Sequence, residues 1–429
     1  MFDWEPKKLI DLAEYLNGYA FSPEDWGADG LPIIRIEQLK NPTAPTDFYA
    51  GRLPEKNIID DGDLIFSWSA SLFLRIWTHG KGALNQHLFK VVEKKGVDRA
   101  FLKAFIEFYL PELTKASHGS TMQHITRKEL DRFSALFPSD EAEQKNIAAI
   151  IGQLDQAIEQ TEAIIAKQQR IKTGLMQDLL TKGIDENGNI RTEATHEFKD
   201  SPLGRIPVEW DIRNLTSLSC GGAQNGFFKK PELVGSGYKL INVSEIYQSF
   251  GINTNDNSVE RVNAKADDLF RYGVAVGDLF FTRSSLVLEG IAHCNIIRFI
   301  NEPTLFECHV IRIKPDKTKI IPEFLALQCR SYKARLFLMS RAKHVTMTTI
   351  SQPELEELDV LVPVNFKEQQ AIVDTVLLSD RAIIHYEQQR NKLIHIKFGL
   401  MRDLLTGKVR VTDINNKPLT PESLCTPLN

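Results

Sequence analysis

The sequence has few cysteines and no long hydrophobic run. Five cysteines in 429 residues, an odd number scattered over the second half, make a poor disulfide framework and suit a reducing cytoplasm. No stretch approaches the roughly 18 apolar residues of a membrane span, and the N-terminus lacks the basic and apolar segments of a signal peptide. Excess positive charge is also missing, because the net charge is −4. Any nucleic-acid-binding surface must therefore be a local patch.

Catalytic signatures are missing too. There is no phosphate-binding Gly-rich loop, no Gly-x-Gly-x-x-Gly fingerprint and no Asn-Pro-Pro-aromatic tetrapeptide. The best candidate metal ligands are four residues with soft donor atoms, His293, Cys294, Cys308 and His309. Their spacing lacks the short gaps of a zinc finger, and His309 corresponds to His87, which has no cysteine nearby. We therefore predict core or strand-end roles for these four, no metal site and no catalytic residue.

The main positive feature is an internal repeat. With 42% hydrophobic and 25% charged residues the chain is globular, and its length predicts two or three domains. At a fixed offset of 225 residues, about 24 of 61 positions from Thr121 onward are identical without a gap. The matches include Pro138, Glu143 and Gln144 with Pro363, Glu368 and Gln369, and Gly174-Leu175-Met176 with Gly399-Leu400-Met401. A period this long indicates a duplicated domain, not a solenoid.

Weaker matches continue upstream with drifting offsets, as expected where loops differ in length. They pair Trp4 with Trp210, Gly62-Asp63-Leu64 with Gly277-Asp278-Leu279, and His87 with His309. The predicted order is a first module (1–138), a central helix (139–183), a linker (184–207), a second module (208–363), a distal helix (364–407) and a C-terminal tail (408–429). Duplication for stability alone is also compatible with this order.

The two helical segments have the spacing of a coiled-coil seam. Apolar residues recur every 3.5 positions on average, at Ile147, Ile151, Leu154, Ile158 and Ile165, and at Ile372, Val376, Ile383 and Tyr386. Each helix would have about 40 residues and a length of roughly 60 Å. A helix of this length with such a narrow apolar stripe is not stable alone. We therefore predict antiparallel pairing of the two helices. The alternative is that each packs on its own module or on another protein.

Each module mixes short strands with amphipathic helices. Predicted strands lie at 31–36, 63–68 and 88–92, with counterparts at 238–243, 278–282 and 310–313, and predicted helices at 101–113 and 323–339. The fold class is α+β, because the elements do not alternate as βαβ units.

Polar residues that differ between the copies form the candidate DNA-binding set. They follow matched strands or lie in a loop before each repeated proline, where they can donate to phosphates and base edges. In the first module they are Arg35, Ser67, Trp68, Ser69, His118, Ser120, Thr121, Gln123 and His124. In the second they are Asn242, Arg283, Ser284, Ser285, Arg341, Lys343, His344, Thr346 and Thr348. For any single residue, an exposed polar loop position is the simpler interpretation.

Together these motifs resemble the specificity subunits of type I restriction–modification enzymes over essentially the whole chain. The repeated Pro-x4-Glu-Gln helix starts carry the resemblance, as do the Gly-Leu-Met-x-Asp-Leu-Leu-Thr helix ends and Gly277-Asp278-Leu279-Phe280-Phe281-Thr282-Arg283. The resemblance implies two similar α/β target-recognition domains separated by two long antiparallel coiled-coil helices, with pseudo-twofold internal symmetry. One departure is that Trp68 stands where the second copy has Arg283, so a role for Arg283 does not transfer to the first.

The resemblance also implies a function and partners. Each domain would read one half of a split, asymmetric target in double-stranded DNA, and the chain would have no catalytic site of its own. Two methyltransferase subunits would bind S-adenosylmethionine, and restriction subunits, an ATP-dependent translocase and nuclease, would bind ATP and Mg2+. Cofactors are thus expected on the partners and none on this chain. Alternatives are an enzyme in its own right, a DNA-recognition subunit of another modification or phage-defence system, and a coiled-coil adaptor that binds protein.

Overall fold

The computed structural model describes residues 4–115, 124–255, 258–344 and 347–411. Its contacts divide the chain into two compact units: Met1–Ala163 with Glu387–Asn429, and Ile164–Tyr386. Each unit mixes helices and strands, which confirms the predicted α+β class. None of the described helices is both long and apolar enough to cross a membrane.

The first unit contains two four-stranded sheets. One has the order β2 (Ala13–Asn17), β9 (Leu88–Glu93), β6 (Leu64–Ser67) and β7 (Phe73–Ile76). The other has the order β4 (Phe48–Tyr49), β3 (Leu31–Ile34), β8 (Gly82–Leu84) and β5 (Ile58–Ile59). A separate antiparallel pair joins β1 (Trp4–Lys8) to β10 (Ser134–Pro138). The short helices are α1 (Leu9–Leu12), α2 (Ile36–Lys40) and α4 (Arg127–Arg132).

The largest hydrophobic cluster of this unit combines a sheet with several helices. The helix α3 (Arg99–Lys115) buries Phe101 and Phe105 in the same cluster as Phe66 and Phe89 of the sheet. The same cluster includes Ile147 and Ile151 of α5 (Glu141–Leu179), and Leu404 and Leu405 of α11 (Phe366–Leu405). Burying an aliphatic side chain of this size contributes about 1.5–3 kcal/mol. The repeated helices are therefore part of the core of the module.

The second unit repeats the arrangement with more strands. Its central sheet has the order β14 (Gln224–Asn225), β22 (Val310–Ile313), β18 (Leu279–Thr282), β20 (Cys294–Phe299) and β16 (Ile252–Asn253). Beside it lie β17 (Arg261–Val262), β15 (Val234–Ile241) and β21 (Thr304–Phe306), and a sheet of β19 (Ser284–Ser285), β24 (Thr348–Thr349) and β23 (Lys343–His344). The pair β13 (Trp210–Asn214) and β25 (Asp359–Pro363) matches β1 and β10. Shorter pieces of this unit include β11 (Phe198–Lys199), β12 (Ile206–Pro207), α6 (Val243–Ile246), α7 (Ala266–Tyr272) and α10 (Gln352–Glu356).

Some predicted elements differ from the structure. The helix predicted at 323–339 is wrong as one element, because it is divided into α8 (Pro322–Cys329) and α9 (Tyr332–Arg341). The division occurs at Ser331, whose hydroxyl caps α9 by accepting from the Ala334 amide. The strands predicted at 31–36 and 238–243 end at Ile34 and Ile241, because α2 and α6 begin directly afterwards.

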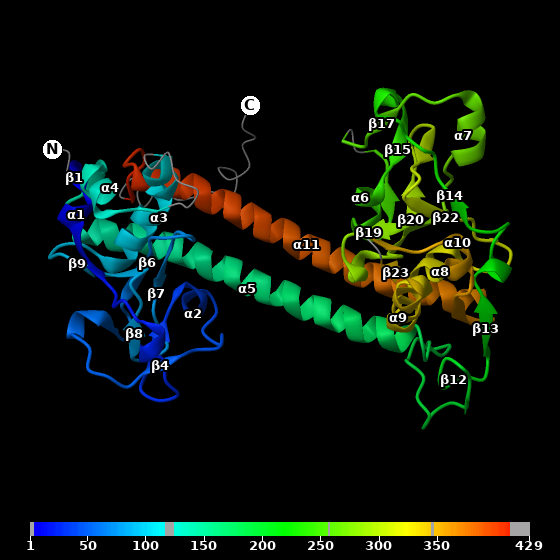
Figure 1. Cartoon of the computed structure of the whole chain (residues 1–429), viewed down its shortest axis with the longest axis horizontal. Helices are drawn as coiled ribbons and strands as arrows, with labels where there is room; N and C mark the ends of the chain where they lie inside the picture. Colours follow the sequence, from blue (N-terminus) through cyan, green and yellow to red (C-terminus); the bar gives the residue numbers. More distant parts are fainter. Residues whose placement is uncertain (1–3, 116–123, 256–257, 345–346, 412–429) are drawn as a thin grey trace. The chain divides into compact units, whose positions relative to one another are not determined.

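The two long helices, α5 and α11 (Figure 1), pack antiparallel in each unit. In the first unit Asp155 of α5 pairs with Lys397 of α11, and Glu143 pairs with Arg410, beyond the end of α11. In the second unit Lys172 of α5 pairs with Asp380 of α11. Asp155 and Asp380 are equivalent in the repeat, as are Lys172 and Lys397. The same ion pair therefore occurs twice with the two helices exchanged, as an internal repeat requires.

The structure also explains why the Pro-x4-Glu-Gln motif is repeated. The carboxylate of Glu143 accepts from the Trp4 indole at 3.2 Å and from the Arg410 guanidinium, and the Gln144 amide donates to the Pro138 carbonyl at 2.9 Å. In the second unit the carboxylate of Glu368 accepts from the indole of Trp210 at 3.1 Å and from the guanidinium of Arg191. Gln369 donates to the Pro363 carbonyl at 2.8 Å. The motif thus fixes each long helix to the first strand and last strand of its module.

Candidate nucleic-acid interface

In the first module, three predicted residues meet around one histidine. The strand β6 leads into Trp68 and Ser69, and the Ser69 hydroxyl lies 3.2 Å from Nδ1 of His87. Trp68 stacks on Phe89 and lies 5.9 Å, centroid to centroid, from the His124 ring. A backbone bridge between Ser69 and His124 closes the group. The resulting cluster contains hydroxyl, indole and imidazole groups, all of which contact nucleic acid in other proteins.

The second module builds the same cluster at the equivalent positions. The Ser284 hydroxyl lies 3.1 Å from Nδ1 of His309, and Ser284 is paired with Thr349 across β19 and β24. Ser284 corresponds to Ser69, and Thr349 corresponds to His124. The structure therefore repeats the serine–histidine contact but changes its neighbours.

A cleft lies beside each histidine. The first-module cleft, of about 290 Å³, is lined by Phe21, Trp26, Arg35, Ile36, Glu37, Asn85, Gln86 and His87. The second-module cleft, of about 490 Å³, is lined by Lys229, Asn242, Val243, Ser244, Glu245, Ser258, Glu260, Glu307 and His309. Arg35 and Asn242 each precede a short helix, and His87 and His309 each precede a central strand. The two clefts therefore occupy equivalent places in the repeat.

A close backbone approach holds one lining residue of each cleft. A parallel bridge joins Tyr19 to Asn85 in the first module, and another joins Phe227 to Glu307 in the second. The residue before each bridge is a glycine, Gly18 or Gly226, whose Cβ would overlap the carbonyl oxygens of the opposite chain. Only glycine permits this approach without displacing the segment that carries the histidine.

The contents of the first-module cleft leave hydrogen-bonding capacity unused. Arg35 lies over the Trp26 ring at 5.0 Å and pairs with Asp47 at 2.7 Å, yet its Nη2 is buried without a partner among the described residues. Three more buried polar atoms around the cleft and cluster are also unpaired within the described part: Trp68 Nε1, Gln86 Oε1 and His124 Nδ1. Unpaired buried groups are costly, so these atoms remain available to hydrogen-bond with water or a bound molecule.

The second-module cleft is charged and internally paired. The Lys229 ammonium donates to Asn242 at 2.7 Å and to Glu260 at 2.5 Å. The hydrogen bond from Lys229 holds the pKa of Glu260 below its usual value. Glu245 accepts from the Asn242 amide, and Glu307 lies beside His309. The two clefts therefore have the same framework but present different chemical groups.

Other residues of the candidate set lie in less accessible places. Ser67, Ser69, Ser285 and Thr348 are buried, which does not fit their expected place at exposed loop tips. Arg341 pairs with Glu357 at 3.0 Å, and Lys343 pairs with Glu354 at 2.7 Å.

Arg283 donates to the Cys308 carbonyl at 3.2 Å. His344 belongs to β23, where only its backbone is described. Five predicted residues lie outside the described part of the chain: His118, Ser120, Thr121, Gln123 and Thr346.

Most residues that line the clefts were not in the candidate set, and Trp26, Lys229 and Glu260 are the clearest examples. They come from loops without periodicity and have no counterparts in the repeat. For Trp26 and Lys229 the one available signal was an aromatic or charged side chain close to glycine and proline residues, and Glu260 had no such signal.

The soft-ligand set suggested by the sequence does not assemble. Cys294 is buried beside Cys329, and burial lowers the pKa of His293 to about 4. Among the described residues, the one group with three donors close enough for an ion is Glu307, Cys308 and His309. Burial and the neighbouring Glu307 raise the pKa of the Cys308 thiol.

The chain belongs to the family described as the type I restriction modification DNA specificity domain, whose model matches residues 1–168 and 207–395. The duplicated match coincides with the internal repeat. The resemblance inferred from the repeated motifs is therefore confirmed.

Relatives support the same family over nearly the whole chain. The chain is 25% identical to the type I restriction enzyme MjaVIII specificity subunit of Methanocaldococcus jannaschii, covering 96% of this chain and 94% of that protein. It is 25% identical to the EcoKI specificity subunit of Escherichia coli, covering 81% and 75% respectively. The solved S subunit from M. genitalium has a TM-score of 0.55 and 15% identity, covering 94% of this chain and 96% of that one, which shows the shared fold.

Proposed function

We propose that this chain is the non-catalytic DNA sequence-specificity subunit of a type I restriction–modification complex and reads an asymmetric, bipartite target in double-stranded DNA. One observation carries the proposal: the same serine–histidine framework occurs twice, beside clefts with different contents. A duplication for stability alone would not require different polar groups at matched positions.

The two clefts suit different base edges. Arg35, Asn85 and Gln86 offer donors and acceptors of the kind that pair with purine edges in the major groove. In the second cleft Glu260 can accept from an exocyclic amine, and Lys229 can contact a guanine edge or a phosphate. The first module thus reads one half-target and the second module reads the other.

The long helices set the distance between the half-targets in this proposal. Their antiparallel contacts, repeated in each unit, suit a pseudo-twofold arrangement made by one polypeptide. Recognition modules that read sites one turn of DNA apart need a separation of roughly 34–36 Å. A paired helix of about 40 residues is long and stiff enough to hold such a separation.

The helices also serve as the docking surface for two methyltransferase subunits. Several large apolar side chains on them are exposed, among them Ile171 (47%), Leu378 (66%) and Phe398 (64%). Large contiguous apolar patches mark protein-association sites, and we propose that these side chains contribute to such patches. In the proposed complex the methyltransferase subunits hold S-adenosylmethionine, and the restriction subunits hold ATP and Mg2+.

Exchange of one module tests this function. Residues 1–137 are replaced by the first module of another family member, and the chain is reconstituted with methyltransferase subunits. Sequencing of methylated DNA should show one changed half-target and one retained half-target.

The control is the reciprocal exchange of residues 208–362, which should change the other half. Retention of both half-targets after either exchange would refute modular reading. Methyl transfer to DNA by the purified chain alone would refute the non-catalytic assignment.

A further inference from the structure

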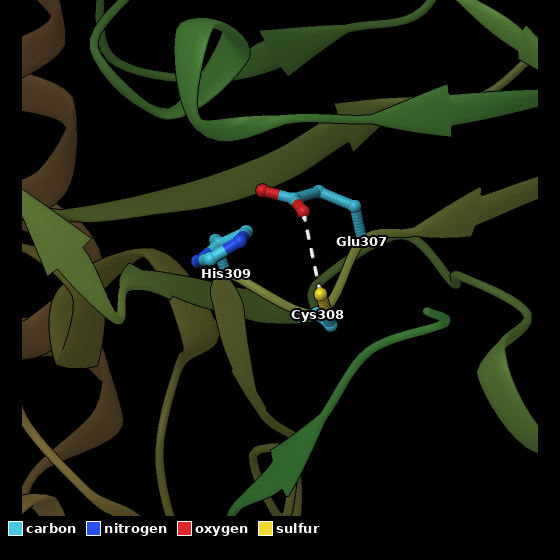
Figure 2. Close-up of side chains that lie close together, drawn as sticks. All are labelled: Glu307, Cys308 and His309. Carbon is cyan, nitrogen blue, oxygen red and sulfur yellow. Dashed lines mark hydrogen bonds between the residues drawn. The ribbon is translucent and has the colours of Figure 1, made fainter. Parts of the chain in front are cut away.

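We propose that Glu307, Cys308 and His309 bind a single zinc-class divalent ion in the second module. The three residues are consecutive in the turn between β21 and β22, and their ligand atoms lie within 4.8 Å of one another. Figure 2 shows the carboxylate, the thiol and the ring grouped at this turn. The site shares Glu307 and His309 with the second-module cleft, but metal binding can be measured without DNA.

The turn that carries the three ligands is held by backbone hydrogen bonds. The Glu307 amide donates to the Ile241 carbonyl at 3.0 Å, and the Glu307 carbonyl accepts from Val310 at 3.1 Å. The bridge to Phe227 holds the same residue from a third side. A metal therefore requires only side-chain rotation to reach a ligand separation of roughly 3.5 Å, the spacing that tetrahedral zinc bond lengths imply.

The burial of Glu307 without a cationic partner is a second, independent indication of a metal site. Its side chain is buried, with 4% of the residue exposed, and it forms no ion pair among the described residues. Its side-chain hydrogen bond comes from the Cys308 thiol at a sulfur–oxygen distance of 3.8 Å. A buried carboxylate without a cation is costly, and a bound metal would supply the missing positive charge.

The types of ligand atom at this site indicate which metals it would bind, and their exposure indicates whether the site is open. A thiolate, an imidazole and a carboxylate suit zinc, or cobalt as its spectroscopic substitute, whereas magnesium and calcium prefer oxygen ligands alone. His309 is exposed and Cys308 is half-buried, so the site is open toward the second-module cleft. Three protein ligands leave a fourth coordination position for water or for a donor from a bound molecule.

The first module provides an internal control. Its equivalent turn carries Asn85, Gln86 and His87, and Asn85 forms the equivalent bridge, to Tyr19. Neutral amides replace the carboxylate and the thiol, so this turn has no comparable ligand set. We therefore expect one ion per chain.

Metal titration of the full-length protein tests the site. Zinc is added in competition with a chromophoric chelator, and cobalt binding is followed by its thiolate charge-transfer absorption in the near ultraviolet. We expect one ion per chain. Cys308→Ser should abolish the thiolate band, and Cys308→Ser, Glu307→Gln and His309→Asn should each weaken zinc binding at least tenfold.

Cys220→Ser, which removes an exposed cysteine, and Cys425→Ser are matched controls that should leave binding unchanged. Circular dichroism verifies that each variant is folded, and because Cys308 is half-buried its serine variant serves if Glu307→Gln does not fold. Zinc binding that survives all three ligand substitutions, loss of the cobalt band only in a control, or failure of the wild-type protein to bind either metal would overturn the proposal.

Discussion

The two modules differ least where they join the long helices and most where they form their clefts. In both modules the indole of a tryptophan in the first strand donates to a buried glutamate, and an arginine forms an ion pair with the same carboxylate. By contrast, Arg35 with unpaired polar atoms occupies one cleft, and a paired Lys229 and Glu260 occupy the other. Folding thus constrains the shared network, whereas the cleft can change without disturbing the core.

The largest expected effect comes from breaking the shared network in the second module. Arg191→Ala leaves Glu368 as a buried, unpaired charge, because both side chains are about nine-tenths buried. We expect a loss of about 3–5 kcal/mol in the free energy of unfolding of that module. Hydrogen exchange followed by mass spectrometry measures each module separately.

The equivalent change in the first module sharpens the comparison. The Arg410 side chain is 29% exposed, so water can partly replace it in Arg410→Ala, and we expect a smaller loss. Arg205→Ala, which removes an exposed ion pair, is the control and should change stability by less than about 0.5 kcal/mol. Equal losses at Arg191 and Arg410 would contradict the burial argument.

An effect of intermediate size is expected on DNA affinity. Each cleft should contribute to the affinity only through its own half-target. Arg35→Ala should weaken binding by about 1–3 kcal/mol when the first half-target is correct, and should have little effect when that half-target is scrambled. Lys229→Ala should show the same dependence on the second half-target. Competition binding of the reconstituted complex to DNAs with one scrambled half measures both.

Arg132→Ala removes an exposed charge of the first module outside the cleft and controls for general electrostatics. If Arg35→Ala and Arg132→Ala weakened binding equally to every DNA, the first cleft would not be a reading site.

The shared part of the molecule was predictable because its residues repeat at a constant offset. Glu143 and Glu368 are 225 positions apart, and the helix seam follows the same spacing. Their arginine partners, Arg191 and Arg410, are 219 positions apart because the segments after the two helices differ in length, so the sequence match did not reveal them. The cleft residues Trp26 and Lys229 come from loops in which only the folded backbone determines which side chains meet.

The smallest effect is a pH dependence that belongs to the second cleft alone. Lys229 lowers the pKa of Glu260 in the folded chain, so the unfolded chain binds the proton more readily. The stabilisation is therefore complete above the ordinary glutamate pKa and is lost as the pH falls through the lower, folded value. Both side chains are about one-third exposed, which limits the contribution to about 0.2–1 kcal/mol.

Lys229→Met tests this pH dependence. Its urea midpoint of unfolding should be lower than that of the wild type at neutral pH, and the two midpoints should converge in acid. Lys230→Met, which removes an adjacent charge without an ion pair among the described residues, should not show this convergence. A difference between wild type and Lys229→Met that persists at low pH would mean that Lys229 stabilises the cleft by packing and not by its charge.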